Sequence, residues 1–149
     1  MRLNWRAAAV FLALLAPVGA RAQACSVSTS GGLAFGSYRP SNTLPTDTTA
    51  NIVMSCNATV GLLVSYTIRL QSASGRKMAG PYGTLSYVLA TDPQFVDSWP
   101  DNRAVAGSIL LTALSLFGTR QQAVYARLAA GQRAGPGSYT DTLMVVVTY

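Results

Sequence analysis

Hydrophobic and polar residues alternate along most of the chain after residue 48, with the period of two that is typical of half-buried β-strands. The stretch TANIVMSC has its apolar residues at even positions over 50–56, and LLVSYTIRL has them at even positions over 62–70. TLSYVLA and QAVYARLA show the same alternation, with inward positions at Leu85, Tyr87, Leu89, Val124, Ala126 and Leu128. The pattern therefore predicts strands that each turn one face toward a core.

Clusters of turn-forming residues separate these strands, as expected of an antiparallel all-β domain. They are Gly31-Gly32, YRPSNTLPTD, SASGRKMAGPYG, TDPQFVDSWPDN and AAGQRAGPG. The segment AGSILLTALSLFG, residues 106–118, has a composition that also suits a helix. The all-β context favours a strand there. Short strands at such intervals indicate a sandwich or a barrel.

The first 24 residues have the three parts of a secretory signal peptide: Arg2 and Arg6, an apolar run, and small residues before a cleavage site. Cleavage after Ala22 or after Ala24 satisfies the small-residue preference. An uncleaved anchor would need about 18 to 20 apolar residues, which is more than this run contains. A lipoprotein that starts at its cysteine usually has a bulky aliphatic residue three positions earlier, whereas this chain has Ala22 there. We expect a signal peptide over 1–24 and one domain over 25–149.

Export would bring Cys25 and Cys56 into an oxidising compartment, where a cysteine pair in a small domain usually forms a disulfide. Cys25 has the parity of Val27, and Cys56 has the parity of Ile52 and Met54. Both thiols should therefore point inward, which fits a bridge between neighbouring strands of a sandwich.

The residue types exclude several functions. The chain has no His and no Glu, which removes the commonest general base and metal ligand, so we predict no enzyme, no metal and no small-molecule cofactor. Of the 11 basic residues, Arg2, Arg6 and Arg21 belong to the signal peptide, which leaves 8 against 5 Asp, a net charge of +3. Without a basic cluster, we expect no nucleic acid partner.

Phe95 and Trp99 lie in TDPQFVDSWPDN, which also holds three of the five Asp residues. If exposed, the two rings would form a surface-contact loop for a sugar or an apolar surface. Alternatively, Trp99 seals the end of the core, and Asp beside Pro and Asn is turn chemistry rather than a Ca²⁺ site or a glycosidase acid. The lack of D-x-D-x-D-G spacing favours the turn interpretation. Tyr139 fits either a tyrosine corner or a core position.

Several motifs occur in a fixed order along the chain. Cys25 is followed by Phe35-Gly36, and the second cysteine ends a strand in NIVMSCNA. Further on come R-x-M at Arg76–Met78, then L-x-Y-x-L, then G-x-Y-x-D at Gly137–Asp141 and a terminal aromatic residue. Together these motifs resemble the spore coat protein U family, the pilin-like subunits of archaic chaperone-usher pili, and the resemblance spans Cys25 to Tyr149. One departure is Ala126, where the family tends to have glycine between Tyr and Arg.

The resemblance implies an immunoglobulin-like β-sandwich that lacks its last strand and is completed by a donor strand from another chain. It implies a periplasmic chaperone, an outer-membrane usher and neighbouring pilus subunits as partners. It also implies a location outside the cell or on a bacterial surface. The acceptor groove would consist of Val27, Leu33 and Phe35 with Leu143, Val145, Val147 and Tyr149 of the last strand. That strand is apolar on both faces, and such an edge aggregates when unpaired.

Shaft subunits of this kind carry a donor segment ahead of the first cysteine, whereas the predicted cleavage leaves at most Gln23-Ala24 here. We therefore expect a subunit that accepts a strand without donating one, at the tip of an assembly or next to it. A misplaced start codon or a donor supplied in another way would also account for this departure. The alternative function is a self-contained surface adhesin or binding module, which would be a stable monomer.

Overall fold

The computed structural model describes residues 23–149, so the predicted signal peptide lies outside the described residues except for Gln23 and Ala24. The described part is all-β, which confirms the predicted fold class. Its strands are β1 (Ala24–Ser30), β2 (Thr46–Asn57), β3 (Leu62–Ser72), β4 (Lys77–Gly80), β5 (Gly83–Ala90), β6 (Ala104–Leu111), β7 (Phe117–Leu128) and β8 (Leu143–Thr148). Within this range nothing helical is long and apolar enough to cross a membrane.

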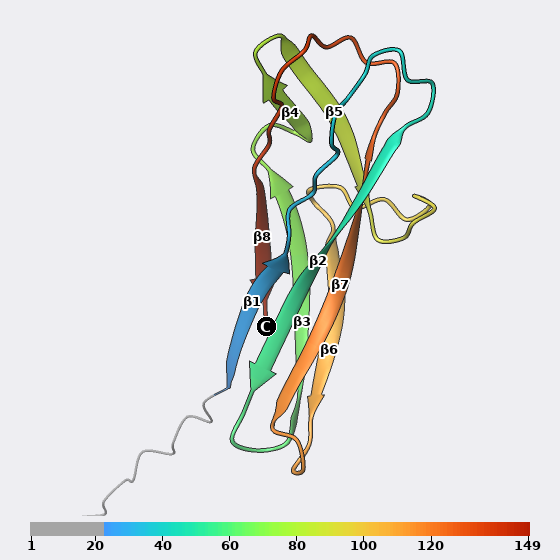
Figure 1. The fold of residues 1–149 in the computed structure, drawn as a ribbon. Helices are drawn as coiled ribbons and strands as arrows, with labels where there is room; N and C mark the ends of the chain where they lie inside the picture. The colour runs from blue at the N-terminus through green and yellow to red at the C-terminus, as the bar shows by residue number, and fades with distance from the viewer. Residues whose placement is uncertain (1–22) are drawn as a thin grey trace, which may run out of the picture.

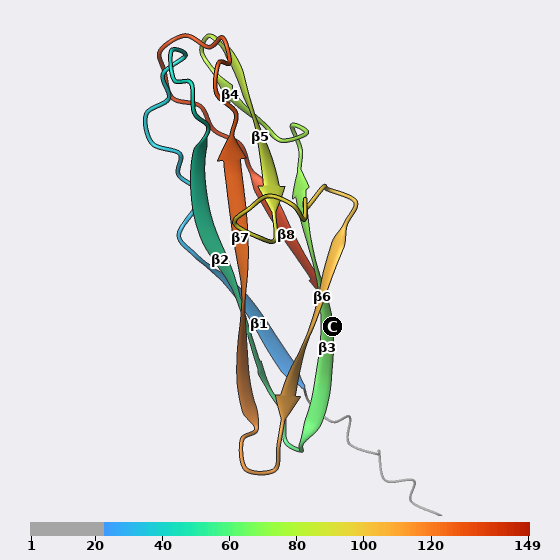
Figure 2. The ribbon, with the colours of Figure 1, turned by 90° about the vertical axis from the view of Figure 1, so that its right-hand side faces the viewer.

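The strands form two antiparallel sheets that face each other (Figures 1 and 2). The larger sheet has the order β1-β2-β7-β5-β4 and curls like half of a barrel, and the smaller one has the order β6-β3-β8. β2 and β7 are paired over their whole length, from Thr46↔Leu128 to Asn57↔Phe117. This arrangement is an incomplete β-sandwich, because the smaller sheet covers only part of the larger one.

The core lies between the sheets and contains the residues that the alternation places inward. All of the inward positions predicted for β5 and β7 are buried, as are Ile52, Met54 and Cys56 of β2 and Val64, Tyr66, Ile68 and Leu70 of β3. Successive side chains of a strand point to opposite faces, so each of these strands has one apolar face toward the opposite sheet.

The prediction of a single strand over residues 106–118 is right in type and wrong in extent. β6 ends at Leu111, and β7 begins at Phe117. Between them, Thr112 and Ser115 exchange backbone hydrogen bonds of 2.9 and 3.1 Å, and the Thr112 hydroxyl accepts a further bond from the Ser115 N–H. This turn carries the chain from the smaller to the larger sheet. It contains neither Gly nor Pro, so composition gave no signal for it.

The predicted disulfide is confirmed. Cys25 lies directly opposite Cys56 in the β1–β2 register, with a Cα–Cα distance of 4.1 Å. The bridge ties the first residues of β1 to the end of β2. It also consumes the thiol that a lipoprotein would need at Cys25.

Tyr139 adopts the tyrosine-corner arrangement, one of its two predicted interpretations. Its hydroxyl donates a hydrogen bond of 2.7 Å to the Gly135 carbonyl, four residues upstream. Its ring lies against the backbone of Gly80, at the end of β4. The corner therefore fixes the path of the chain as it enters β8.

Candidate functional site

The candidate site lies between two edge strands. In the described part of the chain, β1 pairs with β2 alone and β8 pairs with β3 alone. The two strands run along the same side of the molecule and belong to different sheets (Figure 1). The outer edge of each has backbone N–H and C=O groups without a ladder partner, which makes it a template for another strand.

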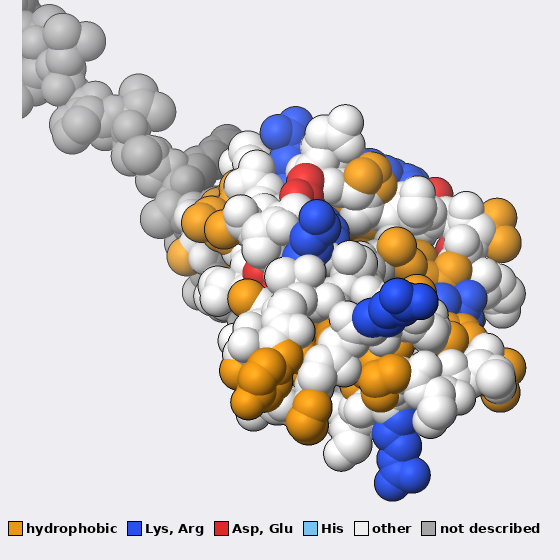
Figure 3. Space-filling model, turned by 90° about the horizontal axis from the view of Figure 1, so that it is seen from above, with side chains coloured by type: hydrophobic (Ala, Val, Ile, Leu, Met, Phe, Trp, Pro, Cys, Tyr) orange, Lys and Arg blue, Asp and Glu red, His pale blue; other side chains and the backbone are white. Residues whose placement is uncertain are grey.

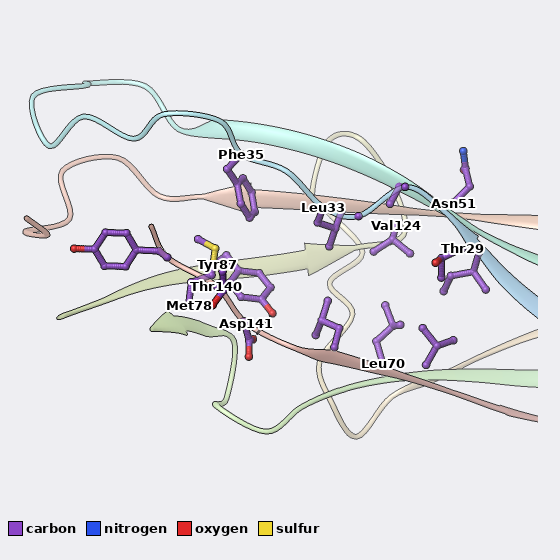
Figure 4. Close-up of a pocket in the computed structure, with 17 residues that line it drawn as sticks. Thr29, Leu33, Phe35, Asn51, Leu70, Met78, Tyr87, Val124, Thr140 and Asp141 are labelled. Carbon is purple, nitrogen blue, oxygen red and sulfur yellow. Dashed lines mark hydrogen bonds between the residues drawn. The ribbon is translucent and has the colours of Figure 1, made fainter. Parts of the chain in front are cut away.

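An open cleft of about 350 Å³ separates the two edges over the upper part of the molecule (Figure 4). On one side it is lined by Thr29 of β1 and by the segment that follows, from which Leu33 and Phe35 point into the cleft. Leu143 and Val145 of β8 line the other side. The cleft is therefore an interruption between the two sheets of the sandwich.

The floor of the cleft is the hydrophobic core itself. Its buried lining residues come from five different strands and are Ile52, Leu70, Met78, Tyr87 and Val124. The rings of Phe35 and Tyr87 lie 6.0 Å apart between centroids and are tilted by 51°. Core side chains thus line an open cleft here, although each is at most 9% exposed, and a complete sandwich would have no such cleft.

A polar cluster borders the cleft around the carboxylate of Asp141, just before β8. The Asp141 carboxylate accepts hydrogen bonds from the hydroxyls of Tyr87 (2.6 Å), Ser72 (2.8 Å) and Ser74 (2.6 Å). The backbone N–H of Thr142 donates a fourth, of 2.8 Å. These bonds join the start of β8 to the end of β3 and to β5.

The same contacts set the ionisation of the cluster. Burial disfavours the charged form of Asp141, but the hydrogen bonds from Ser74, Tyr87 and Ser72 outweigh it and lower the pKa of the carboxyl group. Burial and the bond to Asp141 raise the pKa of Tyr87. At neutral pH the cluster is therefore an ionised carboxylate whose surrounding hydroxyls are protonated donors.

Below the cleft, the end of the chain approaches the start of β1. The Tyr149 hydroxyl donates a hydrogen bond of 3.5 Å to the Cys25 carbonyl. Neither of these residues lines the cleft. The cleft between the sheets therefore does not extend along β1 and β8 as far as this contact.

Four of the seven residues predicted for the acceptor groove line the cleft: Leu33, Phe35, Leu143 and Val145. Val147 packs partly against the core, while Val27 and Tyr149 are exposed. Val27 is in β1, Val147 is in β8 and Tyr149 follows β8, and all three lie beyond the cleft. An acceptor groove over all seven residues remains a prediction.

The surface-contact interpretation of Trp99 is wrong. Its side chain is only 1% exposed, and its indole N–H donates to the Arg103 carbonyl at 3.2 Å. Trp99 therefore seals the core, as the alternative interpretation has it. Phe95 is half-buried, because the guanidinium of Arg127 lies 4.0 Å from its ring centre. Phe95 has a positive φ of 61°, an uncommon conformation for a non-glycine residue.

The Asp residues of this loop are engaged in a turn and in ion pairs. The carboxylate of Asp92 accepts hydrogen bonds from the backbone N–H groups of Gln94, Val96 and Asp97. Asp97 pairs with Arg103, which together with the Thr91 hydroxyl lowers its pKa to about 2. Asp101 pairs with Arg76 at 2.5 Å.

Sequence reasoning missed the floor of the cleft and its polar end. The floor residues occupy inward positions of predicted strands, so the alternation marks them as buried without indicating that a gap reaches them. Asp141 was noticed only as part of a family motif. A carboxylate directly before an apolar strand, with Ser72 and Ser74 after another, was the available signal.

A comparison with protein families now adds to this geometry. The sequence model of the Spore Coat Protein U domain matches residues 11–146, which is most of the chain. The chain belongs to the spore coat protein U family. The matched range starts within the predicted signal peptide and includes both walls of the cleft. Spore coat protein U domains are pilin-like and structural rather than catalytic. A comparison with curated proteins gave no significant match.

Proposed function

We propose that this spore coat protein U domain is an exported structural subunit whose sandwich is completed by a β-strand from another chain. The observation that carries the proposal is the cleft between β1 and β8, two edge strands that flank an opening into the core. A strand laid in this opening would supply ladder partners to the free edge of an adjoining strand. Its alternate side chains would cover the floor residues.

The chemistry of the cleft favours a polypeptide strand over a small ligand. Its walls and floor are mostly aliphatic and aromatic. The carboxylate of Asp141 is already engaged by four donors. What remains unsatisfied is the backbone of the two edges, and an extended peptide is the ligand that pairs with such groups.

Membership of a pilin-like family supports the identity of the partners. We propose a periplasmic chaperone as the first donor, an outer-membrane usher as the assembly site, and neighbouring pilus or coat subunits as the final donors. The Cys25–Cys56 disulfide fits export, because such bonds persist in oxidising compartments. A terminal position, at the tip or next to it, is the finer part of the proposal. A mature N-terminus well upstream of Gln23 would refute it.

Light scattering behind size-exclusion chromatography tests the proposal. The mature chain is expressed in a bacterial periplasm, with and without a chaperone-usher operon. We expect aggregation or degradation of the chain alone and a soluble heterodimer with the chaperone, because the edges of β1 and β8 have no ladder partner and the sandwich is open between them. A folded, stable monomer without any partner would contradict the proposal and favour a self-contained binding module.

A matched pair of variants tests whether the partner binds in the cleft. Val145 lines the cleft, whereas its neighbour Met144 is exposed on the opposite face of β8. We expect Val145→Asp to abolish recovery of the chaperone complex, because a charge would face an apolar donor strand. Met144→Asp, an equal change of charge on the same strand, should leave recovery unchanged. Equal losses in both variants would show that the cleft is not the contact.

A further inference from the structure

Gln132, in the loop between β7 and β8, joins segments of the chain that carry basic residues. The Tyr38 hydroxyl donates a hydrogen bond of 3.1 Å to the Gln132 carbonyl and accepts one of 2.6 Å from the Gln132 N–H. Arg39 follows Tyr38 in the chain, and Arg133 follows Gln132. The two bonds therefore hold the two arginines on adjoining segments.

The side chain of Gln132 extends the same arrangement to β5. It accepts a hydrogen bond of 2.7 Å from the Ser86 N–H and donates one of 2.8 Å to the Ser86 carbonyl. Ser86 lies directly opposite Lys77 in the β4–β5 register. We call Arg39, Lys77 and Arg133 the basic cluster. Its members are far apart in sequence, so only the fold brings them around Gln132.

No carboxylate neutralises the basic cluster within residues 23–149. Three of the five Asp residues form ion pairs with other arginines, namely Arg76, Arg103 and Arg127. Asp92 accepts backbone N–H groups, and Asp141 is surrounded by hydroxyls. All three members of the cluster are exposed. Viewed from above, this end of the molecule presents more basic than acidic side chains (Figure 3).

An exposed aromatic ring adjoins the basic cluster. Tyr82, in the turn between β4 and β5, is 67% exposed. Its side chain lies against the backbone of Gly135, where an added Cβ would be 2.7 Å from the Tyr82 Cβ and 2.9 Å from its Cγ. Gly135 is two residues after Arg133. The ring is therefore held beside the loop that carries Arg133, with most of its surface in solvent.

We propose that the basic cluster and Tyr82 bind an acidic polysaccharide, a chain of sugars that carries carboxylate groups. A guanidinium group matches the geometry of a carboxylate and can donate two hydrogen bonds to it. The face of an aromatic ring offers an apolar surface for the C–H groups of a sugar, while the hydroxyl of Tyr remains in water. Charge and ring together therefore fit an acidic sugar chain.

The surroundings of the cluster argue against two other anionic partners. A protein interface has a desolvated apolar core and is depleted of lysine, whereas these cations are exposed and Arg133 is followed by Ala-Gly-Pro-Gly. Proteins that bind double-stranded DNA contact about 6 to 10 phosphates, which is more than three cations can neutralise.

The proposed polysaccharide site is separate from the strand-binding site. Neither Tyr82 nor any member of the basic cluster lines the cleft. A strand that fills the cleft therefore leaves the cluster and the ring exposed, and both ligands can be bound by one subunit.

Binding to immobilised polysaccharides tests this proposal. The mature chain, alone or in complex with the chaperone, is passed over alginate, a polymer of uronic acids, and over neutral dextran, at about 50 mM and about 300 mM salt. The cluster variant is Arg39→Gln with Arg133→Gln. The control variant, Arg69→Gln with Arg120→Gln, removes the same charge from two exposed arginines outside the cluster that form no ion pair in the described part of the chain.

We expect the wild type to bind alginate at the lower salt concentration and to leave dextran unbound. The apparent affinity should fall about tenfold in the cluster variant and change by no more than about twofold in the control. Higher salt should weaken the binding of the wild type, because charged contacts are screened. Tyr82→Ala should weaken binding about threefold and keep the salt dependence of the wild type, since it removes no charge.

Equal losses in the cluster and control variants would overturn the proposal, because net charge alone would then explain the binding. Failure of the wild type to bind alginate would overturn it as well. Binding to poly-glutamate or to double-stranded DNA as tight as to alginate would assign the cluster to a protein or a nucleic acid instead.

The thermal unfolding midpoint of each variant, measured on the same samples, shows whether it is folded. Failure of the proposed function would appear separately, as a stable monomer in size-exclusion chromatography, whatever the binding to alginate. The two proposals therefore fail in different measurements.

Discussion

Asp141 shows how one residue can determine the shape of the candidate site. Three hydroxyls and one backbone N–H converge on its carboxylate from the end of β3 and the residues after it, from β5, and from the residue before β8. Hydrogen bonds to a charged group are stronger than those between neutral groups. The residues just before β8 are thereby tied to the end of β3 and to β5, beside the cleft.

Asp141→Asn should lower the free energy of unfolding by about 1 to 3 kcal/mol, because an amide cannot accept all four bonds. The pKa of Asp141 is lowered by folding, so its contribution is present above the unfolded pKa of about 3.9 and is lost as pH falls through the folded pKa. The unfolding midpoint of the wild type should therefore fall more steeply with acidification below about pH 4 than that of the variant.

Denaturant or thermal unfolding of wild type and variant over a series of pH values measures both effects. Asp47, Asp92 and Asp97 also have lowered pKa values and remain in the variant, so some acid sensitivity should persist. Identical acid slopes in the two proteins would contradict the role assigned to Asp141.

Gly80 is required by a close approach rather than by its backbone angles. A Cβ built there would lie 2.5 Å from Cε1 and 2.8 Å from Cγ of the Tyr139 ring, which its own hydroxyl bond holds in place. Gly80→Ala should therefore cost about 1 to 3 kcal/mol of stability through overpacking. Gly32→Ala is the matched control, since nothing lies within 4 Å of the added Cβ. Comparable unfolding midpoints for the two variants would argue against the packing of Tyr139 on Gly80.

At the scale of secondary-structure elements, β1 and β8 are the edge strands that flank the cleft. Each pairs with one strand in the described part of the chain, and the residues of β1 are mostly exposed. The disulfide adds a covalent link to the pairing of β1, because it fixes the first residues of β1 to the end of β2. The wall of the cleft that follows β1 depends on this anchor.

Reduction of the disulfide, or the double change Cys25→Ala and Cys56→Ala, should lower the free energy of unfolding by about 3 to 4 kcal/mol in the chain-entropy model. The reason is the separation of 31 residues between the cysteines, which the bond constrains in the unfolded chain. Denaturant unfolding in the presence and absence of a thiol reductant measures the change. Equal midpoints would mean that pairing with β2 alone holds β1.

At the scale of the whole molecule, the cleft interrupts one side of the sandwich. It lies between β1 and β8, which belong to different sheets, and core residues of both sheets form its floor. A strand in the cleft would complete the sandwich.

The segment SASGRKMAGPYG, predicted as a turn, contains β4, so this short strand was missed. The sequence by itself determined the inward faces of β2, β3, β5 and β7 and the disulfide. These follow from local rules: the pleat of a strand alternates its side chains, and parity places Cys25 and Cys56 on inward faces. The turn at Thr112–Ser115 escaped prediction because its residues are common in strands as well.

Tertiary structure alone decided which inward faces are covered. Leu33 and Val145 are far apart in sequence, and they become opposite walls of one cleft only because β1 and β8 end up as edges of different sheets. Trp99 is buried in the core and Leu114 is fully exposed, although both come from turn regions between strands. Local alternation fixes the direction of a side chain relative to its own strand. The packing of distant segments determines whether anything lies in front of it.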